Sequence, residues 1–201
     1  ASRYRNEDRV TLCYLGDGAA NAGIFFETLN MCGLWNLPVI FIIENNQYAM
    51  GTALERHAAD TELHKRGFPF GIKHERLDSM DLVQVLSDAR RIVDEVRSTQ
   101  RPYLVEAISY RFEGHGAADH DRGLYRTRAE EEEWLQRDPI RLFEEYLLKN
   151  NVMTQEKMEA IDEEESVRAR EVYDRADASP HPNISEVYSD VYSDMKPEVG
   201  H

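Results

Sequence analysis

The residues best suited to chemistry begin with a Gly-Asp-Gly turn at 16–18, directly after an apolar, β-prone run at 10–15. Glycine lets the backbone approach a ligand closely, and the helix expected after the turn offers free N–H groups that suit a phosphate. Asp17 would repel a bare phosphate, so its presence predicts a cation between the two. Mg²⁺ is the natural choice, because proteins hold it with carboxylates together with phosphate oxygens. The turn therefore predicts a magnesium–diphosphate site.

A second polar segment opens with Asn45-Asn46 after another apolar run, and 26 residues separate it from Gly18. The side-chain oxygen of Asn46 is a further hard ligand at the end of what should be a neighbouring strand. The carboxylate of Asp17, the amide oxygen of Asn46 and the backbone carbonyl of Tyr48 then predict a clamp for Mg²⁺, completed by diphosphate oxygens. Asp17 and Asn46 can also be plain turn formers, and Gly-Asp-Gly alone is a weak signal. The paired spacing is what favours the metal site.

The elements that must position these loops alternate between strands and helices. The sequence pattern predicts strands at 10–15, 38–44 and 102–110, and helices at 20–35 and 82–96. Asp81 is the expected cap of the second helix, and residues 47–75 are interpreted as irregular. This alternation is typical of an α/β fold with a parallel sheet and crossover helices. Continuous apolar strands predict burial on both faces, and ligands then bind at the carboxyl ends of the strands. A third polar loop, at 111–125, follows the strand at 102–110 and is expected at the same edge of the sheet.

Charge divides the chain into two regions. The formal net charge is −14. Residues 1–128 hold 18 acidic and 16 basic residues, whereas 129–201 hold 20 acidic and 8 basic. This predicts an α/β domain at 1–128 and an acidic helical region at 129–201. Further elements are expected at 127–135, 138–149, 154–177 and 184–192. The run Glu130–Glu133 predicts a solvated helix start.

Composition excludes several classes of function. Phosphates would be repelled by so acidic a chain, so no nucleic-acid partner is expected. The longest apolar run, 38–43, is too short to span a bilayer, so no membrane span is expected. The first nine residues are mostly polar or charged, so no signal peptide is expected either. The two cysteines, Cys13 and Cys32, cannot form a disulfide framework, which favours a reducing compartment.

The sequence around the loops resembles that of the alpha subunits of the thiamine-diphosphate-dependent 2-oxoacid dehydrogenases, in particular their pyruvate-type branch. The resemblance is carried by GDGAAN at 16–21, ENNQYAMGT at 44–52 and YRFEGH at 110–115, and it extends through YRTR at 125–128, RDPI at 137–140 and ADASP at 176–180. It implies a thiamine-diphosphate-binding fold with a helical C-terminal extension. It also implies that the family's N-terminal part is lacking, because this chain is a fragment or because the other half is a separate polypeptide.

The resemblance implies a role for each matching residue. Mg²⁺ would be held by Asp17, Asn46 and the carbonyl of Tyr48, and the cofactor diphosphate would be contacted by Gly18, Ala19 and Asn46. Arg111 and His115 would lie at the diphosphate end and the mouth of the site, with His115 as the catalytic candidate. A guanidinium suits phosphate through its planar fork, and an imidazole can relay a proton near neutral pH. Two alternatives stay open: Arg111 is a structural ion-pair partner, and His115 is a loop histidine without a catalytic role.

The implied activity is oxidative decarboxylation of pyruvate, with transfer of the acetyl group to the lipoyl domain of dihydrolipoamide acetyltransferase. It would require a beta subunit, in an alpha2-beta2 assembly. Use of acetoin or a branched-chain 2-oxoacid, and a non-catalytic assembly fragment, are the alternatives. Gly116 and Leu124 stand where animal relatives carry regulatory serines, which favours a bacterial, cytoplasmic protein. A mitochondrial matrix or plastid location stays open.

Overall fold

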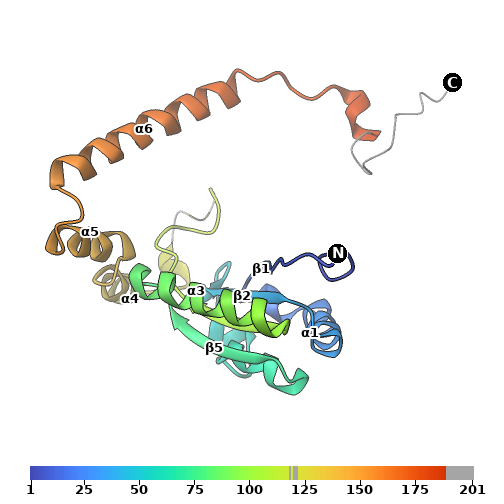
Figure 1. Ribbon diagram of the computed structural model, residues 1–201. Coiled ribbons are helices and arrows are strands. Elements are labelled where there is room, and N and C mark those ends of the chain that lie inside the picture. Colours follow the sequence, from blue (N-terminus) through green and yellow to red (C-terminus); the bar gives the residue numbers. More distant parts are fainter. Residues whose placement is uncertain (118, 120–121, 189–201) are drawn as a thin grey trace. The chain divides into compact units, whose positions relative to one another are not determined.

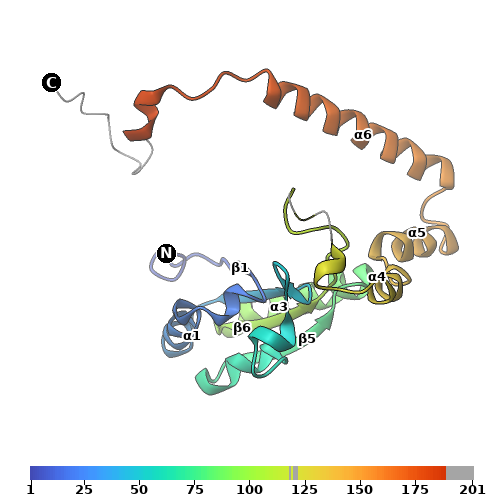
Figure 2. The ribbon, with the colours of Figure 1, turned by 180° about the vertical axis from the view of Figure 1, so that it is seen from behind.

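The computed structural model describes residues 1–117, 119 and 122–188. The chain forms two compact units, Ala1–Lys149 and Asn150–His201. The first holds the sheet and the helices up to α5, and the second holds α6 (Gln155–Asp177) and the 3₁₀ segment η4 (Ile184–Tyr188) (Figures 1 and 2). The acidic segment that starts at residue 129 is therefore divided between the two units.

Four parallel strands form the sheet of the first unit. They are β1 (Thr11–Gly16), β2 (Val39–Asn45), β6 (Tyr103–Ile108) and β5 (Lys73–Asp78), in that spatial order. The register places Gly16 beside Glu44 and Glu44 beside Ala107. The loops after β1, β2 and β6 therefore leave the sheet at the same edge. The predicted α/β fold with a parallel sheet is confirmed.

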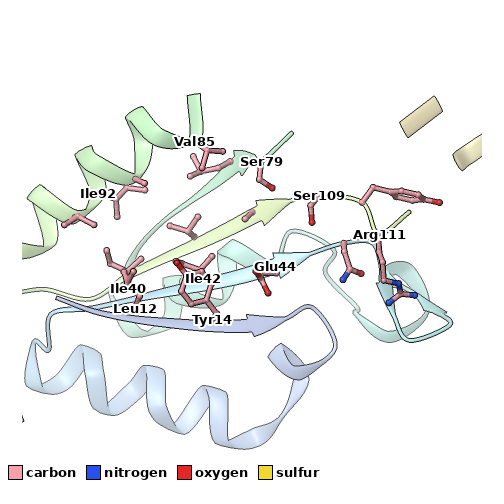
Figure 3. Close-up of a pocket in the computed structure, with 17 residues that line it drawn as sticks. Leu12, Tyr14, Ile40, Ile42, Glu44, Ser79, Val85, Ile92, Ser109 and Arg111 are labelled. Atoms are coloured by element: carbon pink, nitrogen blue, oxygen red, sulfur yellow. The ribbon is translucent and has the colours of Figure 1, made fainter. Parts of the chain in front are cut away.

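Helices cover the two faces of this sheet, with α1 (Gly23–Trp35) on one side and α3 (Leu82–Thr99) on the other (Figure 3). Alternate residues of β2 serve the two sides, as the pleat of a strand requires. One core contains Phe25, Leu29, Phe41, Ile43 and Leu104, and the other contains Ile40, Ile92, Val96, Tyr103 and Val105. The carboxylate of Asp81 accepts the N–H of Gln84 at 3.0 Å, which confirms the predicted cap of α3.

The segment interpreted as irregular contains more structure than the sequence indicated. It holds the hairpin β3 (Tyr48–Ala49) and β4 (Thr52–Ala53), the helix α2 (Leu54–His57), the 3₁₀ segment η2 (Leu63–Phe70) and the start of β5. Strand β5 escapes prediction because its sequence, KHERLD, is mostly charged. It is an edge strand, where charged side chains are common.

Strand β1 lies at the opposite edge of the sheet, and its side chains are not buried as expected. Leu12 is 47% exposed and Tyr14 is 59% exposed. The prediction of a strand covered on both faces is wrong for β1, because α3 packs on β2 and β5 and leaves Leu12 and Tyr14 exposed.

The C-terminal helices agree with their predicted positions. Helices α4 (Arg128–Leu135), α5 (Pro139–Lys149) and α6 follow the expected ranges within two residues. The side chains of Thr127 and Thr154 cap α4 and α6. Segment η4 covers part of the element expected at 184–192, of which 189–192 lie outside the described residues. Within the described residues, every helix is too short or too polar to cross a membrane.

Candidate functional site

The first loop places Asp17 at the carboxyl end of β1 in a buried position. Its side chain is 3% exposed, and Oδ2 lies 2.9 Å from Nε2 of His57. Sequence analysis missed His57, which ends α2 and is 40 residues away, because nothing in the Gly-Asp-Gly turn points to it. The turn continues into η1 (Ala19–Asn21), where Nδ2 of Asn21 lies 2.8 Å from Nδ1 of His57. A carboxylate, an imidazole and an amide thus meet beside the first loop.

The second loop leaves β2 with its backbone shaped by two asparagine side chains. Oδ1 of Asn45 accepts from the N–H of Gln47 at 3.1 Å, and Oδ1 of Asn46 accepts from the N–H of Tyr48 at 3.2 Å. These bonds oppose the cost of a φ of 76° at Gln47, which is unfavourable for a residue with a Cβ. The amide oxygen of Asn46 and the carbonyl of Tyr48 are therefore carried by a turn of defined shape.

Arg111 connects the third loop to the second. Its Nη2 donates to the carbonyl of Met50 at 2.6 Å, and its Nη1 donates to the carbonyl of Tyr48 at 3.4 Å. Nη1 also lies 3.4 Å from Nδ1 of His115. The backbone N–H of His115 donates to Asp119 at 2.8 Å, and this bond lowers the pKa of Asp119. The structure thus brings together Arg111, His115 and Tyr48, which the sequence had singled out separately.

Helix α4 is fastened to these loops by groups that sequence reasoning overlooked. The hydroxyl of Tyr48 donates to Glu130 at 2.8 Å, and burial together with this bond raises the pKa of Tyr48. The side chain of Arg126 is fully buried, donates to the carbonyl of Phe112 at 2.7 Å and pairs with Glu131 at 2.7 Å. The expectation of a solvated helix start is therefore wrong for Glu130, which binds a residue of the second loop.

The first and second loops touch at Gly18. A Cβ added to Gly18 would lie 2.7 Å from the Cβ of Ala49, closer than two carbon atoms can pack. The backbone of Gly18 has φ −65° and ψ −44°, which any residue adopts. Glycine is therefore required here by the approach of the hairpin β3–β4, and not by the backbone angles.

Replacing Gly18 with alanine is expected to destabilise the chain by about 1–3 kcal/mol, the usual cost of an added methyl group in a closed contact. The double variant Gly18→Ala/Ala49→Gly removes the Cβ of residue 49 that the new Cβ of residue 18 would meet. It should recover most of the lost stability. Urea unfolding measures both changes. A double variant no more stable than Gly18→Ala would show that this contact does not limit the approach of the loops.

A groove of 520 Å³ runs along the α3 side of the sheet (Figure 3). Apolar side chains of the strands and of α3 line most of it, among them Leu12, Ile40, Ile42, Val85 and Ile92. Its polar lining residues are Glu44, Asn46, Ser79, Ser109 and Arg111, and Figure 3 shows Glu44, Ser109 and Arg111 toward the carboxyl ends of the strands. Two of the predicted site residues, Asn46 and Arg111, therefore share one groove, and the described lining does not include Asp17. The predicted metal ligands lie on adjoining loops, with Asn46 lining the groove.

Comparison with known proteins identifies the family. The sequence matches the family described as "Dehydrogenase E1 component" over residues 1–185, which is most of the chain. The chain belongs to the dehydrogenase E1 component family.

Among relatives in this E1 family, a pyruvate dehydrogenase E1 component subunit alpha from Porphyra purpurea is 40% identical over 188 residues, covering 94% of this chain and 54% of the relative. The subunit of the same name from Rhizobium meliloti is 39% identical over 192 residues, covering 95% and 55%. The chloroplastic subunit alpha-3 from Arabidopsis thaliana is 38% identical over 202 residues, covering 98% and 47%. The chain spans about half the length of these relatives.

The groups at the carboxyl edge of this E1 sheet fit a hard divalent cation. The carboxylate of Asp17, the amide of Asn46 and the carbonyl of Tyr48 are all oxygen donors, which Mg²⁺ prefers. The Tyr48 carbonyl already attracts the guanidinium of Arg111, so a positive group can reach it. In the described part of the chain, no three His, Cys, Asp or Glu side chains are grouped to hold a metal. A site here would therefore depend on amide and backbone oxygens.

Proposed function

We propose that this chain is the diphosphate-binding part of a pyruvate dehydrogenase alpha subunit. The observation that carries the proposal is the meeting of three loops at one edge of a parallel sheet in a chain of the E1 family. Asp17 follows β1, Tyr48 follows β2, and Arg111 follows β6 and donates to the Tyr48 carbonyl. Ligand sites of open α/β sheets lie at this edge. The names of the relatives support pyruvate as the substrate.

In this proposal, Asp17, Asn46 and the carbonyl of Tyr48 hold Mg²⁺, and the backbone of Gly18 and Ala19 together with Asn46 contacts the diphosphate. Thiamine diphosphate, when bound, supplies the nucleophilic carbon for decarboxylation of a 2-oxoacid. The chain's residues bind and orient it. The close contact of Gly18 with Ala49 lets the backbone of the first loop approach the second, so that both loops could hold the diphosphate.

Arg111 and His115 are proposed for the mouth of the site. The guanidinium of Arg111 is held on two backbone carbonyls, Met50 and Tyr48, and can exchange these for phosphate oxygens, which it binds through its planar fork. The ring of His115 is exposed and lies beside that guanidinium. His115 would donate a hydrogen bond or move a proton at its ring nitrogens where the substrate enters.

The proposed partners are a beta subunit, in an alpha2-beta2 assembly, and the lipoyl domain of dihydrolipoamide acetyltransferase, which would accept the acetyl group. The chain spans about half of its relatives, so the complete activity belongs to the longer assembly. Acetoin or a branched-chain 2-oxoacid as substrate, and a non-catalytic assembly role, are the competing functions.

A substrate comparison tests this function. The full-length protein, mixed with its beta subunit, Mg²⁺ and thiamine diphosphate, is expected to reduce an electron-accepting dye fastest with pyruvate. Two additional methyl groups in 2-oxoisovalerate should lower kcat/KM by about 10-fold or more in a pocket shaped for pyruvate. Faster turnover of 2-oxoisovalerate or acetoin would show that pyruvate is not the preferred substrate. No turnover, together with no calorimetric binding of thiamine diphosphate, would favour the assembly role.

A further inference from the structure

A chain of hydrogen bonds ends on the carboxylate of Asp17 and starts on a guanidinium. Nη2 of Arg66 donates to Oδ1 of Asn21 at 2.7 Å. Nδ2 of Asn21 lies 2.8 Å from Nδ1 of His57, and Nε2 of His57 lies 2.9 Å from Oδ2 of Asp17. The four residues come from η2, η1, α2 and the end of β1, so four separate segments meet in this arrangement.

The direction of every bond in this chain follows from Arg66. A guanidinium has only donors, so the Asn21 atom facing it must be the carbonyl oxygen. The amide of Asn21 is then turned with its N–H₂ group toward His57, and Nδ1 of His57 must accept. An imidazole that accepts at Nδ1 is neutral and carries its proton on Nε2. His57 therefore donates to Asp17 through Nε2.

Packing holds the members of the chain in place. His57 ends α2, and Leu54 at the start of α2 and Ala58 directly after it are each 6% exposed and belong to the apolar core. The N–H of Leu54 donates to the carbonyl of Gln47 at 3.0 Å, so α2 is attached to the second loop. The guanidinium of Arg66 lies 5.7 Å from the ring centroid of Phe26, a cation–π contact that restrains its position.

One oxygen of the Asp17 carboxylate is already engaged in a hydrogen bond. Oδ2 accepts from His57, and within the described residues no donor reaches Oδ1. The hydrogen bond from Nε2 of His57 fixes the orientation of the carboxylate. Outer partners of this kind orient metal-binding side chains and raise their basicity.

We propose that Arg66, Asn21 and His57 form a positioning relay that orients the carboxylate of Asp17 toward a divalent cation. This inference rests on the proposed function, because it takes Asp17 as a metal ligand. None of the three relay residues touches the metal in this proposal. His57 donates to Asp17, Asn21 donates to Nδ1 of His57 and holds the ring, and Arg66 fixes the amide orientation of Asn21.

The tautomer of His57 tests the relay without any metal. In the 201-residue chain labelled with ¹⁵N at histidine, NMR should show the ring of His57 protonated at Nε2 and unprotonated at Nδ1, with the signals assigned from His57→Gln. Asn21→Ala should keep the proton on Nε2, because Oδ2 of Asp17 only accepts, and should shift the Nδ1 signal, because Nδ1 loses its donor. A proton on Nδ1 in the unmodified chain would overturn the relay.

Metal affinity tests the positioning role. The dissociation constant of Mn²⁺, measured from the paramagnetic resonance of the free ion with thiamine diphosphate and the beta subunit present, should rise about 10–100-fold in His57→Ala. His57→Gln retains an N–H donor and should recover most of this loss. Arg66→Gln should weaken binding several-fold. Its matched control, Lys65→Gln, removes the same charge one residue away from an exposed side chain and should not.

The possible failures are distinguishable. Unchanged Mn²⁺ affinity in His57→Ala, with normal binding by the unmodified protein, would overturn the positioning role alone. Equal losses in Arg66→Gln and Lys65→Gln would assign the effect of Arg66 to its charge and overturn its place in the relay. No Mn²⁺ binding by the unmodified protein would overturn the proposed metal site, and the positioning role with it.

Discussion

Replacing Asp17 with asparagine is expected to weaken divalent metal binding by about 100-fold or more. The loss of an outer partner alone costs 10–100-fold, and Asp17 is proposed to touch the metal directly. Asparagine keeps the size of the side chain and an oxygen that can accept from His57, so the fold should survive while the charge is lost. The measurement is the Mn²⁺ dissociation constant in the presence of thiamine diphosphate and the beta subunit.

Asp60 supplies a matched control for this variant. It is exposed, and its Oδ1 accepts the N–H of Glu62 at 2.9 Å, a turn contact that asparagine also makes. Asp60→Asn removes the same charge from the same unit and should leave metal affinity unchanged. If Asp17→Asn bound Mn²⁺ as tightly as the unmodified protein, Asp17 would be a turn residue and the magnesium assignment would be wrong.

The largest effect on stability is expected at Glu106, a fully buried carboxylate in the middle of β6. Its Oε1 accepts from Nδ2 of Asn45 at 2.7 Å, and its Oε2 accepts from the backbone N–H of His64 at 3.1 Å. Nδ1 of His64 lies 2.8 Å from the same oxygen. Glu106→Gln keeps one oxygen and places an N–H₂ group against the donors at the other position in a closed interior, and should cost about 3–5 kcal/mol.

Urea unfolding of Glu106→Gln checks this expectation against Glu75→Gln. Glu75 lies on the neighbouring strand β5, and its side chain is 26% exposed and paired with Arg91 at 2.6 Å. Solvent weakens such a pair, so its loss should cost about 1 kcal/mol or less. Equal destabilisation by the two substitutions would show that the buried network around Glu106 contributes no more than a surface ion pair.

The parallel sheet and its three loops could be predicted from the sequence because they depend on local signals. An apolar run followed by glycine or asparagine marks where a strand ends, and parallel strands bring such ends to one edge. Asp17, Asn46 and Arg111 were found in this way. Strand β5 was not, because the charged sequence of an edge strand lacks the apolar signal that marks β2 and β6.

The partners of the site residues could not be predicted, because they come from distant parts of the chain. His57 reaches Asp17 from 40 residues away, and Glu130 reaches Tyr48 from 82 residues away. No spacing rule connects such pairs. Glu106 is different, since a carboxylate inside an apolar strand is itself a signal that a buried polar network surrounds it. That signal is present in the sequence.

The exposed strand β1 has a consequence for how this chain behaves in concentrated solution. Its outer edge presents backbone N–H and C=O groups, and Leu12 and Tyr14 place apolar surface beside them. An uncharged, β-prone edge of this kind is a template for a strand of another molecule. The net charge of −14 repels other copies only over about 10 Å at 0.1 M salt. Self-association of the isolated chain should therefore begin at β1, and salt should accelerate it.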